Sequence, residues 1–182
     1  MKKLFTTTIL TLTLLSTTAQ AKIVHWDNIQ DFKKVDGYYK KLDKMQTPTI
    51  DLTRFKDYSG MRLLKEVDLY VNHNITYQSE PQGVDNWQTP EETLTLKTGD
   101  CEDYALLKMW ILQQLGVNER DMYIEQGINE TTSEFHAVLE IIDGSHVYYL
   151  DNMQEDITHN SIKPLGAYTI NRFGVNFYIE DK

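Results

Sequence analysis

Apolar residues recur at helical spacing through the first part of the chain and at every second position through the last part. The segments with helical spacing, followed by those with alternation, are residues 26–45, 61–75 and 101–115, then 122–128, 135–143, 146–151 and 167–179. Apolar residues three or four apart predict amphipathic helices, and alternation predicts strands with one buried face. Helices first and strands afterwards favour an α+β fold, with an antiparallel sheet packed against helices.

Two helix starts carry specific signals. Thr89 precedes a proline and stands three residues before Glu92, which predicts a capping box with proline at the first helical position. A second helix begins at Cys101, directly after Asp100, which is a good N-cap, and Gly116 ends it. Apolar residues surround nearly its whole circumference, so we expect this helix to be buried on most sides.

The first 21 residues have the pattern of a signal peptide. Two lysines, a short apolar stretch at residues 4–15 and the small-x-small sequence Ala19-Gln20-Ala21 predict cleavage after Ala21. Residues 22–182 would remain, a length suited to one domain. No apolar run is long enough to cross a bilayer, so we expect an exported protein that does not span the membrane.

The charge balance excludes some partners. The formal net charge is −9, and removal of two lysines with the leader makes it −11. A chain this acidic, without a cluster of basic residues, is not suited to bind nucleic acid or an anionic membrane surface.

Cys101 is the only cysteine, so the chain cannot form an internal disulfide or a cysteine-based zinc site. At the start of a helix, the dipole and the free backbone N–H groups favour thiolate, and the same N–H groups can receive an oxyanion.

Asp100, Glu102 and Asp103 oppose this activation of the thiol. One like charge about 6 Å away disfavours thiolate by roughly 2–3 kcal/mol at an effective dielectric of about 20. A histidinium, a divalent cation or outward-turned side chains would compensate for these acids. The alternative is that they only cap the helix.

A cysteine nucleophile needs a base with an orienting partner, and the predicted hairpin supplies both. If Asp143 and Gly144 form a two-residue turn, His136 stands directly opposite Asp151 on the same face of the sheet. If the loop is instead Gly144-Ser145, His136 faces Met153. The first register predicts the triad Cys101, His136 and Asp151.

The order and spacing of several motifs resemble the bacterial transglutaminase-like cysteine peptidases, which include the LapG-type adhesin-releasing proteases. The motifs, which lie within residues 67–153, are "VNHNITYQ", "DNWQTPEETL", "TGDCEDYALLK", "FHAVLEI" and "YYLDN".

The resemblance implies a papain-like, transglutaminase-type core with Cys101 as nucleophile, His136 as base and Asp151 as orienter. It also implies periplasmic residence and dependence on Ca²⁺, with Asp100 and Glu102 as ligands and Asp103 as a further candidate. The substrate would be a large surface adhesin cut near its N-terminus. An inner-membrane receptor for cyclic di-GMP would inhibit the protease by binding it.

Two other functions remain compatible with these residues. The same acyl-enzyme could pass its acyl group to an amine, which would make the protein a transglutaminase or amidase. A non-catalytic, calcium-dependent protein-binding module would keep the acids and bury an inert Cys101.

Overall fold

The computed structural model describes residues 29–129, 134–157, 162–171 and 174–178. The expected signal peptide and the first three residues of the helix predicted over residues 26–45 lie outside this part of the chain. The helices and 3₁₀ segments are α1 (Ile29–Leu42), η1 (Leu52–Phe55), α2 (Gly60–Asn74), α3 (Pro90–Leu96), α4 (Cys101–Gln114) and η2 (Glu119–Asp121). The strands are β1 (Thr76–Tyr77), β2 (Thr98–Gly99), β3 (Met122–Asn129), β4 (Phe135–Asp143), β5 (His146–Leu150), β6 (Ile162–Asn171) and β7 (Gly174–Tyr178).

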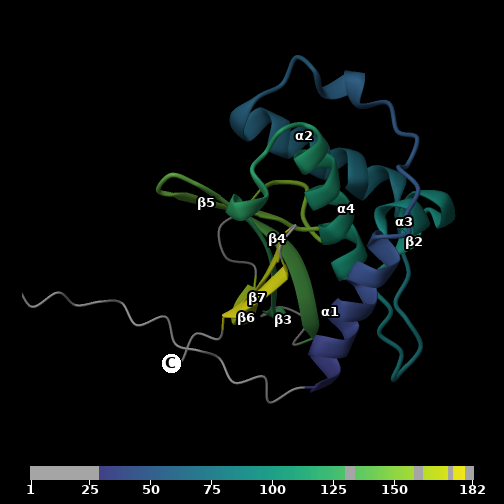
Figure 1. The fold of residues 1–182 in the computed structure, drawn as a ribbon. Helices are drawn as coiled ribbons and strands as arrows, with labels where there is room; N and C mark the ends of the chain where they lie inside the picture. The colour runs from purple at the N-terminus through teal and green to yellow at the C-terminus, as the bar shows by residue number, and fades with distance from the viewer. Residues whose placement is uncertain (1–28, 130–133, 158–161, 172–173, 179–182) are drawn as a thin grey trace, which may run out of the picture.

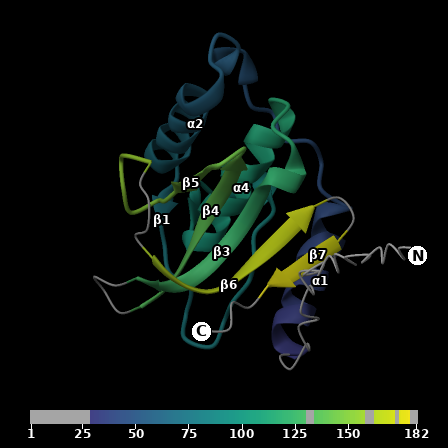
Figure 2. The ribbon, with the colours of Figure 1, turned by 90° about the vertical axis from the view of Figure 1, so that its left-hand side faces the viewer.

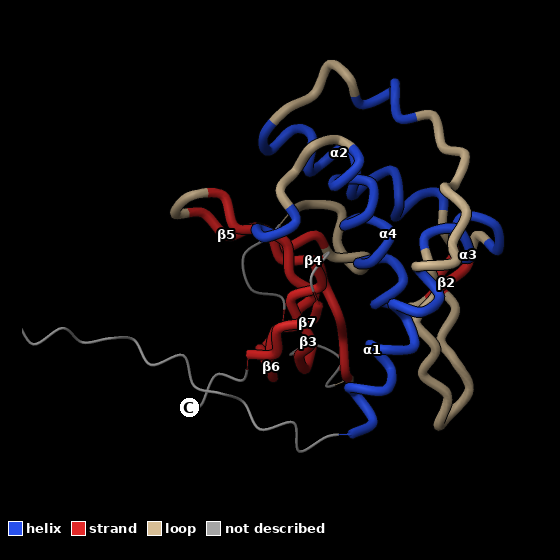
Figure 3. Tube along the Cα trace, in the orientation of Figure 1, coloured by secondary structure: helices blue, strands red, loops and turns tan. Residues whose placement is uncertain are grey.

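Five strands form one antiparallel sheet in the order β5-β4-β3-β6-β7. The helices gather on one side of this sheet (Figures 1 and 3), and the view turned by 90° shows α4 behind β3 and β4 (Figure 2). The predicted α+β class, with helices packed on an antiparallel sheet, is confirmed.

Helix α4 lies at the centre of the molecule and packs against β4, α2 and α3. Every residue from Glu102 to Leu112 is buried, as its nearly uniform apolar circumference predicts. Its first residue is Cys101, and Gly116 follows its end with a φ of +89°, a conformation that glycine adopts without strain.

The chain reaches the start of α4 through α3 and β2. The predicted capping box of α3 is present, because the Thr89 amide donates to Glu92 Oε2 (2.7 Å) and the Glu92 amide donates to Thr89 Oγ1 (3.2 Å). After α3, the strand β2 pairs in parallel with β1, which follows α2. This pairing of two short strands, which the sequence pattern did not predict, anchors Gly99 directly before the N-terminus of α4.

One predicted strand is wrong in its extent. Alternation over residues 167–179 predicted a single strand, whereas the structure has β6 and β7, paired so that Asn171 faces Gly174. A strand that reverses keeps a period-two pattern on both sides of the turn. Alternation alone therefore does not locate the reversal, and Ile179 lies outside the described residues.

Candidate active site

The N-terminus of α4 is held by Asp103, which stands three residues after the N-cap Asp100. Asp103 Oδ2 accepts from the Asp100 amide (3.3 Å), and Asp103 Oδ1 accepts from the Gln88 amide (2.8 Å). Gly99 lies against the same side chain, since a Cβ at Gly99 would stand 2.7 Å from the Cβ of Asp103. One buried carboxyl group thus ties the segment before α3 and the first turn of α4 together.

His136 and Asp151 form a buried pair. His136 Nε2 lies 2.7 Å from Asp151 Oδ1, and the side chains are 5% and 0% exposed. The same Asp151 oxygen accepts from the Met153 amide at 2.9 Å. A hydrogen bond donated by Nε2 leaves Nδ1 as the nitrogen that can accept a proton.

The hairpin register that predicted this pair is wrong, although the pair itself is present. Asp143 pairs with His146 and Leu139 with Leu150, so the two loop residues are Gly144 and Ser145. In that register Asp151 is not directly opposite His136. The paired part of β5 ends at Leu150, and the carboxyl group of Asp151 reaches His136 from the loop that follows.

The turn explains the error. Of the two loop residues only Gly144 has a positive φ, +61°. A glycine with positive φ at the first loop position is typical of a type II′ turn, whereas the predicted type I′ turn needs positive φ at both positions.

Cys101 lies beside the strand that carries the histidine. The backbone amide of Ala137, which directly follows His136 in β4, is close enough to the thiol to lower its pKa. On the other side of β4, Gly127 of β3 stands opposite His136, next to an irregularity in the pairing of β3 with β6. Irregular pairing of this kind is over-represented near active sites, where it redirects strands. The structure therefore brings the three predicted catalytic residues into one region.

The acids around Cys101 oppose ionisation of the thiol, in the direction expected from the sequence. Burial raises the pKa of the Cys101 thiol, and the charge of Glu102 and its contact with the thiol raise it further. In that contact the sulfur donates to Glu102 Oε2 at 3.1 Å. The amide of Ala137 acts in the opposite direction but is the smaller influence.

The carboxyl groups of Asp100, Glu102 and Asp103 all have raised pKa values. Burial raises the pKa of Glu102 to about 8, and the neighbouring Asp100 carboxyl contributes to this. Burial likewise raises the pKa of Asp103 to about 7. The pKa of Asp100 is raised by burial and by the charges of Glu80 and Asp85, although a hydrogen bond between the Asp100 and Glu102 side chains lowers it.

The predicted calcium ligands differ in how free they are to bind a cation. Both oxygens of Asp103 accept backbone hydrogen bonds, whereas the carboxyl groups of Asp100 and Glu102 contact each other as hard oxygen donors with raised pKa values. A divalent cation such as Ca²⁺ suits this donor chemistry, so Asp100 and Glu102 fit the group. Within the described ranges, no three His, Cys, Asp or Glu side chains form a ready-made metal cluster.

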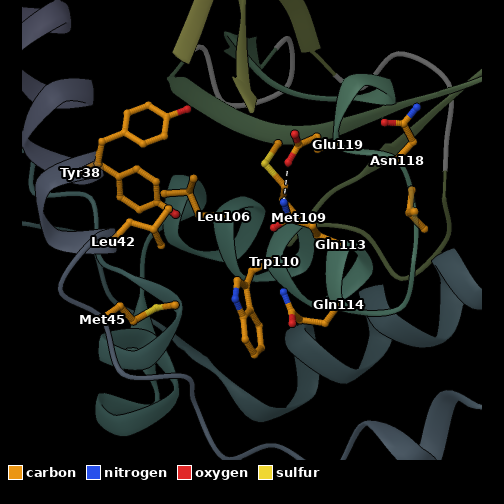
Figure 4. A pocket seen from close by; sticks show the side chains of 12 residues that line it. Tyr38, Leu42, Met45, Leu106, Met109, Trp110, Gln113, Gln114, Asn118 and Glu119 are labelled. Carbon is orange, nitrogen blue, oxygen red and sulfur yellow. Dashed lines mark hydrogen bonds between the residues drawn. The ribbon is translucent and has the colours of Figure 1, made fainter. Parts of the chain in front are cut away.

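A separate groove lies between α1 and α4. Its volume is about 620 Å³, and Figure 4 shows Tyr38 and Leu42 on one wall with Leu106, Met109 and Trp110 on the other. None of the three candidate catalytic residues lines it. The concave feature and the candidate chemistry are therefore in different places.

Sequence reasoning missed three polar residues close to this site. They are Asp68 and Asn72 of α2 and Lys108 of α4. Lys108 pairs with Asp68, and Asn72 donates to the backbone oxygen of Asp151. Lys108 did carry a signal, because it is a single charge within the apolar run of α4. Asp68 and Asn72 are four residues apart on an amphipathic helix, where nothing in the sequence distinguishes them from solvent-facing residues.

Comparison with known families gives one match. The family described as "Bacterial transglutaminase-like cysteine proteinase BTLCP" matches residues 40–164, which include the three candidate catalytic residues. A search of curated proteins finds no match.

Solved structures of similar fold include LapG from Legionella pneumophila. Its calcium-bound form is 23% identical with a TM-score of 0.62, covering 80% of this chain and 87% of that chain. Its EGTA-treated form is 22% identical with a TM-score of 0.58, covering 75% of this chain and 89% of that chain. Among the described residues, no helix has the length and apolar character needed to cross a bilayer.

Proposed function

The chain belongs to the bacterial transglutaminase-like cysteine proteinases, and on that premise we propose that it is a calcium-dependent endopeptidase with the triad Cys101, His136 and Asp151. The observation that carries the assignment of residues is the buried 2.7 Å contact between His136 and Asp151, formed beside a cysteine at a helix N-terminus. Nucleophile, base and orienting acid then stand in one region of a cysteine peptidase fold.

The geometry supports a thioester mechanism. Nδ1 of His136 accepts the proton of the Cys101 thiol, and the sulfur attacks the scissile carbonyl carbon. The developing oxyanion is stabilised by backbone N–H groups at the start of α4. The imidazolium then donates its proton to the leaving amine as the C–N bond breaks, which leaves a thioester. Water, deprotonated by His136, releases the acid and restores the thiol.

Asp151 holds the imidazole in the tautomer that this sequence requires. Its carboxylate accepts a hydrogen bond from Nε2–H, so Nδ1 stays free to act as the base, and the negative charge stabilises the imidazolium when it forms. Because Asp151 is buried, this interaction is shielded from solvent.

We assign calcium to Asp100 and Glu102, with Asp103 as the residue that positions the loop carrying them. The ion would supply positive charge where these carboxyl groups oppose ionisation of Cys101. Support comes from the carboxyl–carboxyl contact of Asp100 and Glu102 and from the calcium-bound form of a protein of similar fold. Binding of the cation would also compete for the Glu102 carboxyl group, which here accepts a hydrogen bond from the Cys101 thiol.

The proposal includes an exported protein whose leader is removed after Ala21, leaving residues 22–182 in the periplasm. The substrate is a large cell-surface adhesin, cut near its N-terminus, so that the peptidase controls surface attachment and biofilm. An inner-membrane receptor for cyclic di-GMP is the expected inhibitor. The leader and its cleavage site follow from the pattern of the first 21 residues, whereas the periplasmic residence, the substrate and the inhibitor follow from the family resemblance.

Labelling with iodoacetamide tests the triad and the metal together, because Cys101 is the only thiol. We expect rapid labelling in calcium, slow labelling after chelation, and slow labelling of His136→Ala under both conditions. Slow labelling that is indifferent to His136 and calcium would instead favour a non-catalytic binding module.

A comparison of cells that produce the wild-type protein or Cys101→Ser tests the substrate. Labelling of new N-termini on released surface proteins should identify a large adhesin cut only in the wild type. If the released protein carries an added amine at the cut residue, the enzyme is an acyl transferase. If no surface protein differs between the strains, the adhesin assignment is wrong.

A further inference from the structure

A fully buried ion pair joins α2 and α4 behind the candidate triad. Lys108 Nζ lies 2.6 Å from Asp68 Oδ1, and the two side chains are 0% and 1% exposed. Burying two charges costs free energy that an apolar pair of similar volume would not, so such a pair is weak evidence for stability alone. The position of the Lys108–Asp68 pair therefore indicates a role other than stability.

Lys108 lies on the same face of α4 as the nucleophile. It follows Cys101 by seven residues, and seven residues at 3.6 per turn return almost to the same side of a helix. The face of α4 that presents the thiol beside β4 thus continues, two turns later, into the buried lysine. This face is directed toward the side of the molecule where the histidine and Asp151 meet.

Helix α2 extends the same polar arrangement to the loop of Asp151. Asn72 follows Asp68 by one turn, and its Nδ2 lies 3.5 Å from Asp68 Oδ2. Asn72 Nδ2 also donates to the backbone oxygens of Asp151 (3.0 Å) and Gln154 (3.3 Å). One side-chain amide therefore connects the buried ion pair to both ends of the turn that carries the orienting acid.

The loop that carries Asp151 begins where the paired part of β5 ends. The last paired residue of β5 is Leu150, and the Asp151 carboxyl group beyond it contacts His136 and the Met153 amide, while Asn72 holds the Asp151 backbone. Its charge is also felt by the pair, since Asp151 opposes the burial that lowers the pKa of Lys108. Burial raises the pKa of Asp68, and the charge of Asp151 adds to that effect.

We propose that Asp68, Asn72 and Lys108 are positioning residues that hold the Asp151 loop, and through it the His136 imidazole, in the geometry that catalysis requires. The inference rests on the proposed triad. Asn72 supplies the mechanical link to the loop, and Lys108 supplies a buried positive charge near a buried carboxylate, while Asp68 holds the lysine in place.

Two variants test these three residues, here called the polar layer, without leaving a buried charge unpaired. Asp68→Asn/Lys108→Met removes both charges at nearly constant volume, and Asn72→Leu removes the amide donors at nearly constant shape. The matched control is Lys65→Met/Asp156→Asn. It removes an exposed ion pair of 2.7 Å that also joins α2 to the segment after β5.

The readout is the tautomer of His136, measured by ¹⁵N NMR of imidazole-labelled protein at mildly alkaline pH and assigned with His136→Gln. The wild type and the control should show His136 almost wholly as the Nε2–H tautomer. Both layer variants should show a mixture of tautomers, because Asp151 no longer holds the ring. A purely structural role would lower the thermal midpoint and leave the tautomer unchanged.

Alkylation of Cys101 in calcium at one pH provides the second readout. Both layer variants should react about 10- to 100-fold more slowly than the wild type, the range of loss seen when outer-shell partners of functional side chains are removed. Variants that fold and keep the wild-type tautomer and alkylation rate would overturn the inference. If the wild type itself reacts slowly and independently of His136, the proposed triad fails, and the tautomer result still decides whether the layer orients the ring.

Discussion

Replacing Asp151 by asparagine and by alanine separates the two effects of its carboxylate on His136. Two donors, His136 Nε2 and the Met153 amide, converge on the same Asp151 oxygen, Oδ1. An asparagine can place its carbonyl oxygen there and satisfy both donors. The Met153 amide, which cannot donate to an NH₂ group, favours that orientation. Asparagine thus keeps the imidazole orientation and loses only the charge.

The expected losses differ by orders of magnitude. Hydrogen bonds to charged groups contribute about 1–2 kcal/mol more than neutral ones, so Asp151→Asn should lower kcat/KM by about 5- to 30-fold. Asp151→Ala removes the orientation as well, and removal or mis-setting of the acid in other triads costs roughly 10⁴-fold. Alanine also leaves the Met153 amide without its acceptor, which should lower the free energy of unfolding by about 1–3 kcal/mol.

The assay is cleavage of a peptide spanning the cut site found by the N-terminal labelling above, in calcium, with chemical denaturation run in parallel. Asp151→Asn should lose less unfolding free energy than Asp151→Ala, because asparagine still satisfies the Met153 amide. If a folded Asp151→Asn protein is as inactive as Asp151→Ala, the shared-oxygen geometry does not set the tautomer and the reasoning is refuted.

Three further predictions concern the region before and at the start of α4. Glu102→Gln should speed alkylation of Cys101 in calcium-free buffer by about tenfold or more. The difference from the wild type should grow as the pH rises through about 8, because the wild-type Glu102 carboxyl group then ionises and opposes the thiolate. Equal rates at all pH values would contradict this. Gly99→Ala should destabilise the protein by about 1–3 kcal/mol in denaturant titrations, because its Cβ would overlap Asp103, whereas wild-type stability would mean that the segment shifts freely. Thr89→Ala should cost about 1 kcal/mol by loss of the cap of α3, measured as a lower thermal midpoint, and an unchanged midpoint would show that the cap contributes nothing.

Much of the candidate site could be predicted because its parts are encoded locally. The start of α4 follows from Asp100 and the apolar run after it, and its end follows from Gly116. The bounds of β4 follow from alternation that stops at a glycine-containing turn. The contact between His136 and Asp151 was expected on a register that is wrong. It occurs because the side chain of Asp151 reaches His136 from the loop beyond β5.

By itself, the sequence determined the starts of α3 and α4 and the helical and alternating segments. Each of these depends on hydrogen bonds or spacings among a few neighbouring residues. Only the tertiary structure decided the hairpin register, the reversal between β6 and β7, the parallel pairing of β1 with β2, and the burial of Lys108 against Asp68. Some of these features join segments that are far apart in the chain. The hairpin register could shift by two residues and still keep the same side chains on the same face of the sheet. Their geometry is set by which arrangement packs the core and pairs the buried polar groups, and no local pattern encodes that choice.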